Sequence, residues 1–416
     1  MKERIGIGFI GYGLRGPGVM ECFLKMDDVD IIAVCDRFPE RCQKAADRVK
    51  EVKGNTPILT DNYKDMLKMD NIDAIVNAGA WADHTQVAID TMEAGKAIAF
   101  EVGGAYSIDE CWELVKAQER TKMHCMMLEN CCYAKLEMAI MNMAKQGVFG
   151  KVVHCDGGYC HDLRKSMVKG HENDHHYRLA NYMHRNSDCY PTHALGPIIK
   201  ILNINRGNKM LSLTSMASCS GGLNEHIKSE YGEGHSLANY NFAQGDIVTT
   251  TIKCVNGETI TLRLDTSLPR AYSRRFEVHG TKGLFMEDGN MVYLQNEHAD
   301  MREKPKELYN NADGYVEKYM HPLWKDEEKA ENGEAVNMNT GHGGTDDKVC
   351  RAFIDSVKYD MPTPIDVYDS VALMCITALS EESIAKGGAP VLVPDFTNGK
   401  YLTRKPLSLE DNKWNL

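Results

Sequence analysis

The feature that most constrains the fold is a glycine pattern close to the N-terminus. Residues 11–16 read Gly-Tyr-Gly-Leu-Arg-Gly, directly after a β-branched run at 5–10 and before a helical stretch at 17–26. Glycines at this spacing allow a tight turn between a strand and a helix, and they let a ligand approach the backbone closely. The pattern therefore predicts the first strand–helix turn of a doubly wound sheet.

A second strand, predicted at 31–35, leads to Asp36, 20 residues (36 − 16) after Gly16. In folds of this kind an acid at that distance binds the adenosine ribose of a dinucleotide, and the helix N-terminus binds its pyrophosphate. Asp36 favours NAD over NADP because its carboxylate would repel a 2′-phosphate. The neighbouring Arg37 leaves NADP open, since an arginine can neutralise that phosphate.

Short apolar runs alternate with amphipathic stretches through the first third of the chain. The predicted strands are 5–10, 31–35, 74–78, 97–100 and 123–128, and the predicted helices between them are 17–26, 38–50, 84–95 and 107–121. Strands buried on both faces that alternate with helices form a parallel sheet. We therefore predict an α/β fold, with a Rossmann-type doubly wound parallel sheet over residues 1–128.

The remainder, 129–416, is predicted to be an α+β domain with a largely antiparallel open sheet. A helical stretch at 134–146 is followed by strands at 151–159, 247–254, 259–266, 275–280 and 291–294. Asn256-Gly257 between two alternating runs predicts a hairpin. Helical periodicity returns over 344–386, and we expect these helices to pack back toward the first domain.

Composition excludes several classes of protein. A chain of 416 residues exceeds the size at which one core keeps growing, so two domains are expected. With 48 basic and 59 acidic residues the net charge is −11, and no basic tract occurs, so we expect no nucleic-acid or membrane partner. The 14 cysteines include no CxxC, and the N-terminus reads as a strand rather than a signal peptide. A cytoplasmic protein with free thiols is predicted.

Two further segments follow predicted strands, where this fold places its ligand. Trp81 and His84 come after the strand at 74–78, and Glu101-Val102 comes after the strand at 97–100. By spacing alone, packing and capping at a helix start explain Trp81 and His84 equally well.

In the second half, polar side chains gather at one strand end. Tyr159, His161, Asp162 and Arg164 follow one another closely at the end of the strand at 151–159, and His193 precedes an apolar helix. Taken singly, each has an ordinary structural explanation: a core tyrosine, a hydrogen-bonded His–Asp pair, and a histidine at a helix start.

Taken together, seven separated segments resemble a known family. The N-terminal half resembles the glucose–fructose oxidoreductase and inositol dehydrogenase superfamily, and the segments resemble glycoside hydrolase family 109 within it. That family contains NAD-dependent α-N-acetylgalactosaminidases. The segments are Leu-Glu-Asn (128–130), Gly-Tyr-Cys-His-Asp-Leu-Arg (158–164), Tyr-Arg-Leu (177–179), Tyr-Pro-Thr-His-Ala-Leu-Gly-Pro (190–197), Ser-Leu-Pro-Arg-Ala-Tyr-Ser-Arg (267–274), Gly-His-Gly-Gly-Thr-Asp (341–346) and 385–396.

The resemblance implies glycoside cleavage by transient oxidation. NAD would take a hydride from C3 of the sugar, loss of the C2 proton would expel the C1 substituent, water would add, and the hydride would return. This differs from hydrolysis by two carboxylates. His193 would serve the C3 hydroxyl, and Tyr159 would act at C2. A phenol of pKa about 10 needs a nearby positive charge to act as a base, for which Arg164 and Arg178 are candidates.

The family motifs also imply the binding residues, with a small glycoside as substrate and NAD as cofactor. Matched substrate positions are Tyr159, Arg178, Tyr190, Pro191, Thr192, His193 and Tyr272. Matched cofactor positions are Gly11, Gly13, Leu14, Arg15, Gly16, Asp36, Trp81, His84, Glu101, Val102 and Asn130. No metal is expected, although His171 and His175, at i and i+4, could hold one on a helix face.

Two departures leave other activities open. The wider superfamily carries Glu-Lys-Pro where this chain has Glu101-Val102-Gly103, which disfavours a dehydrogenase using that lysine. The hydrolase family usually has proline at the position of Gly103 and often an export signal. The alternatives are a sugar oxidoreductase or eliminase that stops at the 3-keto or unsaturated sugar, and an NAD-binding sensor without turnover. A homo-oligomer formed through the exposed sheet face is also expected.

Overall fold

The chain divides into two compact units in a computed structural model that describes residues 3–172, 177–301, 305–325 and 341–415. The first unit comprises Met1–Lys135, Pro322–Ala372 and Leu407–Leu416. The second comprises Leu136–His321 and Leu373–Pro406. Two segments from late in the sequence therefore belong to the first unit.

The first unit is built on a six-stranded parallel sheet in the order β3-β2-β1-β4-β5-β6. Its order reverses between β1 and β4, and in such sheets a ligand binds outside the carboxyl ends of the strands at that point. The predicted Rossmann-type sheet is confirmed. The strands are β1 (Ile5–Ile10), β2 (Val29–Cys35), β3 (Ile58–Thr60), β4 (Ala74–Asn77), β5 (Ala97–Phe100) and β6 (Cys125–Met127).

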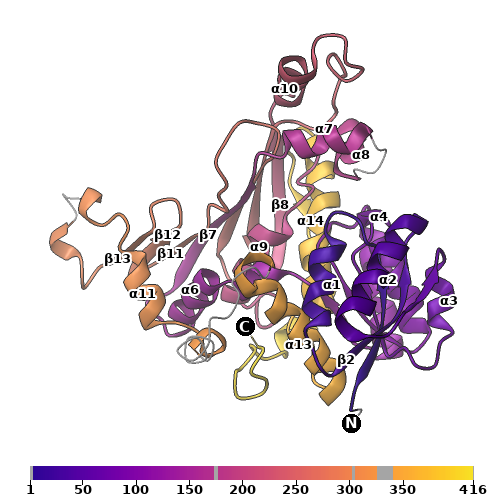
Figure 1. The fold of residues 1–416 in the computed structure, drawn as a ribbon. Coiled ribbons are helices and arrows are strands. Elements are labelled where there is room, and N and C mark those ends of the chain that lie inside the picture. Colours follow the sequence, from indigo (N-terminus) through magenta and orange to yellow (C-terminus); the bar gives the residue numbers. More distant parts are fainter. Residues whose placement is uncertain (1–2, 173–176, 302–304, 326–340, 416) are drawn as a thin grey trace. The chain divides into compact units, whose positions relative to one another are not determined.

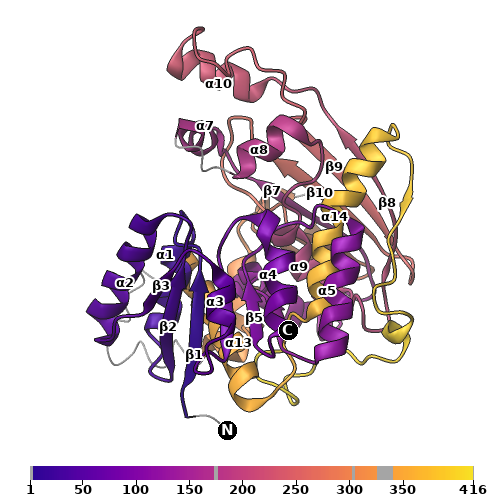
Figure 2. The ribbon, with the colours of Figure 1, turned by 90° about the vertical axis from the view of Figure 1, so that its right-hand side faces the viewer.

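Helices connect these parallel strands (Figure 2). Right-handed crossovers place α1 and α2 on one face of the sheet and α4 and α5 on the other. Strand β3 and helix α3 were not predicted, because β3 is a three-residue edge strand whose side chains are mostly exposed, so it shows no buried apolar run. The helices are α1 (Gly16–Leu24), α2 (Pro39–Lys53), α3 (Tyr63–Leu67), α4 (Trp81–Glu93) and α5 (Ile108–Thr121).

The helices expected over 344–386 are two in the structure. Helix α13 (Thr345–Tyr359) packs against α1 within the first unit, and α14 (Val367–Ala385) follows. Asp360 ends α13 in the left-handed conformation, with φ of +53°. Pro362 and Pro364 then prevent the helix from continuing.

The second unit contains an eight-stranded sheet in the order β13-β12-β11-β7-β10-β9-β8-β14 (Figure 1). Only the β7–β10 pair is parallel, so the prediction of a largely antiparallel sheet is confirmed. Asn256-Gly257 forms the predicted hairpin between β9 and β10. The strands are β7 (Val152–Cys160), β8 (Met210–Ala217), β9 (Ile247–Cys254), β10 (Thr259–Asp265), β11 (Glu277–Gly280), β12 (Gly283–Met286), β13 (Met291–Leu294) and β14 (Val391–Leu392).

One face of this sheet is covered at β7 by α9 (Thr192–Ile201). Along β9 and β10 buried residues alternate with half-buried or exposed ones, as expected of a sheet with one open face. Among the residues that the structure describes, the other helices of four or more residues are η1 (Asn130–Tyr133), α6 (Lys135–Lys145), α7 (Arg164–Glu172), α8 (Tyr177–His184), α10 (Gly222–Tyr231), α11 (Ala312–Lys318) and η4 (Gly341–Gly344).

The cysteines and the apolar character of the helices also bear on the expectations from composition. All 14 cysteines lie in the described ranges and carry free thiols, 13 of them buried. Within the same ranges, none of the helices has the length and apolar character needed to cross a bilayer.

Candidate active site

The glycine turn between β1 and α1 has the close backbone packing that its sequence predicts. Gly11 adopts a φ of +87°, and a Cβ on Gly16 would lie 2.1 Å from the carbonyl oxygen of Gly11. A side chain at either position would therefore force the turn open. Leu14, at the tip, is 91% exposed, so the outer surface of the turn is accessible to a ligand.

Asp36 closes the end of β2 and lies beside this turn. Its carboxylate accepts hydrogen bonds from the backbone N–H groups of Tyr12 (2.8 Å) and Phe38 (3.0 Å). These bonds fix the side chain, and each oxygen can accept a second hydrogen bond, such as one from a ribose hydroxyl. Arg37 stacks over the ring of Phe38, with 4.7 Å between its guanidinium carbon and the ring centroid.

Three buried polar atoms near the carboxyl ends of β4 and β6 fit a bound cofactor. Asn77 Nδ2, His84 Nδ1 and Asn130 Oδ1 have no hydrogen-bond partner within the described part of the chain. Burial lowers the pKa of His84 to about 4, so its ring is neutral, and Nε2–H donates to the carbonyl of Gly79 at 3.2 Å. Buried polar atoms are normally satisfied, so these three indicate groups that a ligand would complete.

Arg15 is fixed by two acids of the same unit. Its guanidinium donates to both carboxylate oxygens of Asp346 (2.7 and 2.8 Å) and to Glu101 (3.1 Å). Asp346 also accepts a 2.7 Å hydrogen bond from Asn130. Asp346 is 1% exposed. Through these hydrogen bonds it connects the dinucleotide turn at Arg15 with η1 at Asn130 and with its own helix, α13.

Trp81 explains why this chain has glycine at position 103. The indole is 5% exposed, and a Cβ on Gly103 would lie 2.6 Å from its Cδ1 atom. A proline there, as in the family pattern, would collide with the indole as it is placed here. Val102 beside it is buried as well. The predicted cofactor residues thus all lie in the first unit, around the carboxyl ends of β1, β2, β4, β5 and β6.

The predicted substrate residues form an aromatic cluster in the second unit. The Tyr159 ring lies 4.3 Å from Tyr190, 5.6 Å from His193 and 6.5 Å from Tyr272, between centroids. Tyr159 and Tyr190 are buried, whereas Tyr272 is 52% exposed. The cluster therefore has one accessible side, which suits binding of a sugar.

Helix α9 and strand β7 bring this cluster together. Pro191 is the N-cap of α9 and no side chain caps the helix, so His193 is not the capping residue that it resembles in isolation. Its Nε2 lies 3.3 Å from the hydroxyl of Tyr190. A Cβ on Gly157 would lie 2.9 Å from the carbonyl oxygen of Ala194, so the glycine allows α9 to approach β7 this closely. Thr192 is fully buried.

The structure distinguishes the two arginines proposed to assist Tyr159. Arg164 forms a bidentate ion pair with Asp162 (2.9 and 2.7 Å). The guanidinium carbon of Arg178 instead lies 5.9 Å from the Tyr159 ring centroid and 5.1 Å from that of Tyr190. Arg178 is 7% exposed, so its charge acts in a largely desolvated setting. The side chain of Asp162 pairs with Arg164 and not with His161, which differs from the structural explanation offered for these residues singly.

Three residues close to the predicted site residues were assigned no catalytic or binding role from the sequence: His161, Asp188 and Asp346. His161 stacks edge-on against Tyr272 at 5.1 Å, and burial lowers its pKa. Asp188 is buried, and this burial raises the pKa of its carboxyl to about 7. A hydrogen bond from the backbone N–H of Tyr190 acts in the opposite direction and lowers that pKa. Asp346 is the third. All three lie in segments that resemble the family or adjoin one, but nothing in their spacing marks them individually.

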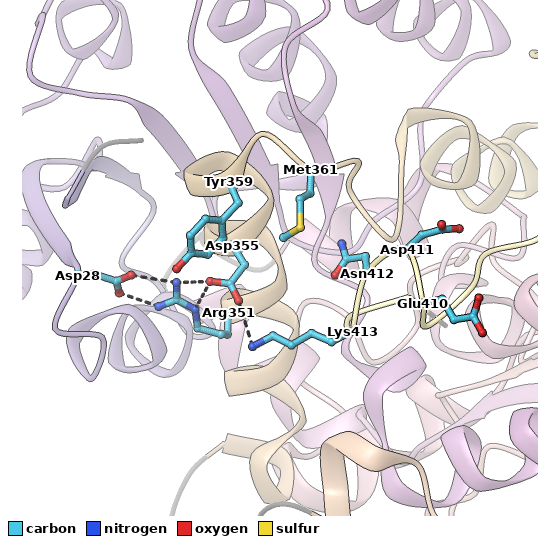
Figure 3. Close-up of a pocket in the computed structure, with 9 residues that line it drawn as sticks. All are labelled: Asp28, Arg351, Asp355, Tyr359, Met361, Glu410, Asp411, Asn412 and Lys413. Atoms are coloured by element: carbon cyan, nitrogen blue, oxygen red, sulfur yellow. Dashed lines mark hydrogen bonds and ion pairs between the residues drawn. The ribbon is translucent and has the colours of Figure 1, made fainter.

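A cavity of about 510 Å³ lies elsewhere in the first unit (Figure 3). The side chains that line it include Arg351, whose guanidinium binds Asp28 and Asp355, and Lys413, whose ammonium lies 3.6 Å from Asp355. None of the predicted site residues lines this cavity. His171 and His175 cannot be placed, because their side chains lie outside the described residues.

Comparison with known proteins settles the family. Residues 133–403 match the family described as Glycosyl hydrolase 109, C-terminal domain, and residues 5–129 match the Oxidoreductase family, NAD-binding Rossmann fold. The chain belongs to glycosyl hydrolase family 109. An alpha-N-acetylgalactosaminidase from Tannerella forsythia is 38% identical to it over 423 residues, covering 96% of this chain and 87% of that protein. A glycosyl hydrolase family 109 protein from Parabacteroides distasonis is 37% identical over 428 residues, covering 97% and 89%.

Solved structures show the same fold as this family 109 chain. Levoglucosan dehydrogenase in complex with NADH and L-sorbose aligns with a TM-score of 0.68 at 18% identity, covering 95% of this chain and 100% of that one. Myo-inositol 2-dehydrogenase from Lactobacillus plantarum aligns with a TM-score of 0.63 at 16% identity, covering 94% and 100%. With its NAD-binding Rossmann unit and its family 109 unit, the chain is an NAD-dependent glycosidase.

Proposed function

We propose that the protein cleaves an α-N-acetylgalactosaminide by transient oxidation of its sugar, with the catalytic groups in the aromatic cluster of the second unit. The substrate class is taken from the Tannerella forsythia relative, which is 38% identical over nearly the whole chain. The observation that carries the proposal is the grouping of Tyr159, Tyr190 and His193, whose rings lie within 5.6 Å of one another. Aromatic rings and imidazoles suit sugar binding and proton transfer.

The first unit binds the cofactor through its backbone and a few fixed side chains. When bound there, NAD would supply the hydride acceptor for oxidation at C3 of the sugar and the hydride donor for the later reduction. The turn at Gly11–Gly16 would hold the pyrophosphate with its N–H groups, and Asp36 would accept hydrogen bonds from the adenosine ribose. Asn77, His84 and Asn130 offer their unsatisfied atoms to the rest of the cofactor.

The second unit performs the proton transfers. His193 accepts the proton of the C3 hydroxyl as that carbon is oxidised, and it returns the proton when the ketone is reduced. The ketone acidifies the C2 proton, which Tyr159 removes, and the C1 substituent then leaves. Water adds at C1 while a proton returns to C2, so the net reaction is hydrolysis. Arg178 favours the phenolate form of Tyr159 because a nearby positive charge stabilises an anion.

Two variants test this site directly. His193→Ala and Tyr159→Phe should each abolish release of nitrophenol from para-nitrophenyl α-N-acetylgalactosaminide while NAD remains bound. Tyr293→Phe, on β13 and outside the cluster, is the control and should keep the wild-type rate. A wild-type rate in either cluster variant would show that the catalytic groups lie elsewhere.

The stoichiometry of NAD separates the alternative activities. Hydrolysis with many turnovers per NAD, across a panel of para-nitrophenyl glycosides, supports the proposed function. Stoichiometric accumulation of NADH without cleavage would establish a sugar oxidoreductase, and an unsaturated sugar product would establish an eliminase. Binding of NAD without turnover of any glycoside would indicate a sensor.

We further propose that the protein is a cytoplasmic homo-oligomer that associates through the open face of the second unit's sheet. The half-exposed residues of β9 and β10 on that face are mainly threonines, which can pack against a second copy without a large apolar patch. Light scattering coupled to size exclusion should give a mass at least twice the 46.6 kDa of one chain. A mass of one chain at micromolar concentration would exclude this assembly.

A further inference from the structure

The segment 407–415 is attached to the first unit by a buried tryptophan. It lies outside the residues that the two family models match, which are 5–129 and 133–403. It nevertheless belongs to the same compact unit as the dinucleotide turn. Trp414 is 6% exposed, whereas Leu409 of the same segment is 42% exposed. Trp414 is therefore the main apolar anchor of this segment.

Trp414 binds η1 through Tyr133. The hydroxyl of Tyr133 donates to the backbone carbonyl of Trp414 at 3.0 Å, and the two rings meet edge-on with 6.5 Å between their centroids. Tyr133 is fully buried, and a buried hydroxyl needs the partner that this carbonyl supplies. Tyr133 is the last residue of η1, and Asn130 is the first. One short helical turn thus carries both the residue held by Trp414 and a proposed cofactor residue.

Trp414 also binds α13, through Asp355. Its indole N–H donates to Oδ2 of Asp355 at 2.7 Å, and the ammonium of Lys413 lies 3.6 Å from the same oxygen (Figure 3). Nε of Arg351 donates to the other oxygen of Asp355 at 2.8 Å. Asp355 is 5% exposed, so these hydrogen bonds form where little water competes for them. Trp414 is therefore fixed to α13 as firmly as to η1.

The two elements that Trp414 joins also meet at the cofactor site. Asp346 lies on α13, nine residues (355 − 346) before Asp355, and it accepts a 2.7 Å hydrogen bond from Nδ2 of Asn130. Helix α13 and η1 are thus connected twice, directly through Asn130 and Asp346 and indirectly through Trp414. Oδ1 of Asn130 is buried and has no hydrogen-bond partner among the described residues. The position of η1 therefore decides where this oxygen meets a cofactor.

From these contacts we propose that Trp414 is a positioning residue for NAD, which sets the place of Asn130 by joining η1 to α13. The inference rests on the proposed placement of NAD beside Asn130. Without Trp414, the buried hydroxyl of Tyr133 loses its acceptor and a space opens beside its ring, so η1 shifts and carries Asn130 with it. Loss of one well-placed hydrogen bond weakens binding by about threefold to tenfold.

The test measures the Kd of NAD by equilibrium dialysis, at a temperature well below the thermal midpoint of the NAD-free protein. Trp414→Ala should raise the Kd about tenfold. Tyr133→Phe removes only the hydroxyl that binds the Trp414 carbonyl, and it should raise the Kd about threefold even if Trp414→Ala does not fold. Because the Kd is measured on folded protein, a merely structural role would lower the thermal midpoint of these variants and leave the Kd unchanged.

A double-mutant cycle shows whether the effect passes through Asn130. Asn130→Ala alone should raise the Kd, and adding Tyr133→Phe should raise it no further. The matched control is Tyr368→Phe, which removes a hydroxyl that donates to Glu119 on α5 of the same unit, and it should keep the wild-type Kd.

Two results would overturn the proposal while leaving the cofactor placement intact. One is a wild-type Kd in Tyr133→Phe, and the other is a full multiplication of its effect by that of Asn130→Ala. A wild-type Kd in Asn130→Ala would overturn the proposal together with the placement of NAD beside Asn130. The glycosidase proposal is tested separately, by turnover.

Discussion

Replacing Gly157 with alanine should misplace His193, the proposed catalytic histidine, without changing any of the proposed catalytic groups. The added Cβ would lie 2.9 Å from the carbonyl oxygen of Ala194, and 3.1 Å from both the Ala194 Cβ and the Ile198 Cδ1. Ordinary contacts between such atoms are about 3.4 Å or longer, so α9 must move away from β7 by about 0.5 Å. His193 lies in the first turn of α9 and would move with it.

The expected losses of folding stability and of kcat in Gly157→Ala follow from two known effects. Adding one methyl group to a tightly packed interface costs about 1–3 kcal/mol of folding stability. A displacement of about 1 Å in a reacting group can cost about 100-fold in rate, so about 0.5 Å should cost about tenfold in kcat. Urea unfolding measures the stability, and nitrophenol release under saturating NAD measures kcat.

The control is Gly234→Ala, in a loop of the same unit where an added Cβ meets no atom within 4 Å. It should leave both stability and kcat within error of the wild type. If Gly157→Ala were as active as the wild type despite losing stability, the close approach of α9 to β7 would not be what positions His193. The reasoning about this helix would then be refuted.

Three further predictions concern other parts of the molecule. Arg178→Gln should lower kcat and move the rising limb of its pH profile to higher pH, because the phenolate of Tyr159 loses a stabilising charge; an unmoved limb would contradict this role. Gly103→Ala should weaken NAD binding several-fold by displacing Trp81, and equilibrium dialysis of NAD against the wild type measures this; unchanged NAD binding would contradict it. The ion pairs of Asp28 with Arg351 and Lys358 hold the pKa of Asp28 well below its usual range, so they stabilise the fold above about pH 4, and stability should fall as pH drops below that. Asp28→Asn should reduce that fall in urea titrations.

The N-terminal sheet could be predicted because its strands are buried on both faces and its turn requires glycine. Asp36 followed from spacing alone, since a fixed length of chain connects the turn to the end of the second strand. Strand β3 could not be predicted, because an exposed edge strand carries little hydrophobic pattern. More than one helix was expected over 344–386, and Pro362 and Pro364 mark the break between α13 and α14.

The aromatic cluster was predictable only in part. Its members come from β7, α8, the start of α9 and the segment after β10, and no spacing rule places residues so far apart in sequence next to one another. Their grouping was therefore expected from the family resemblance, whereas the choice of Arg178 over Arg164 needed the ion pair with Asp162. The role of Gly157 also depends on a contact between distant segments, which no local pattern encodes.

The central claim is that cleavage proceeds through removal of the C2 proton next to a transient ketone. The most direct measurement is hydrolysis of the para-nitrophenyl glycoside in D₂O, followed by NMR of the released sugar. The account predicts deuterium at C2 of the released sugar, no deuterium at C3, and turnover that requires less than one NAD per bond cleaved. A released sugar that keeps its original hydrogen at C2 would contradict the account and would indicate direct displacement at C1.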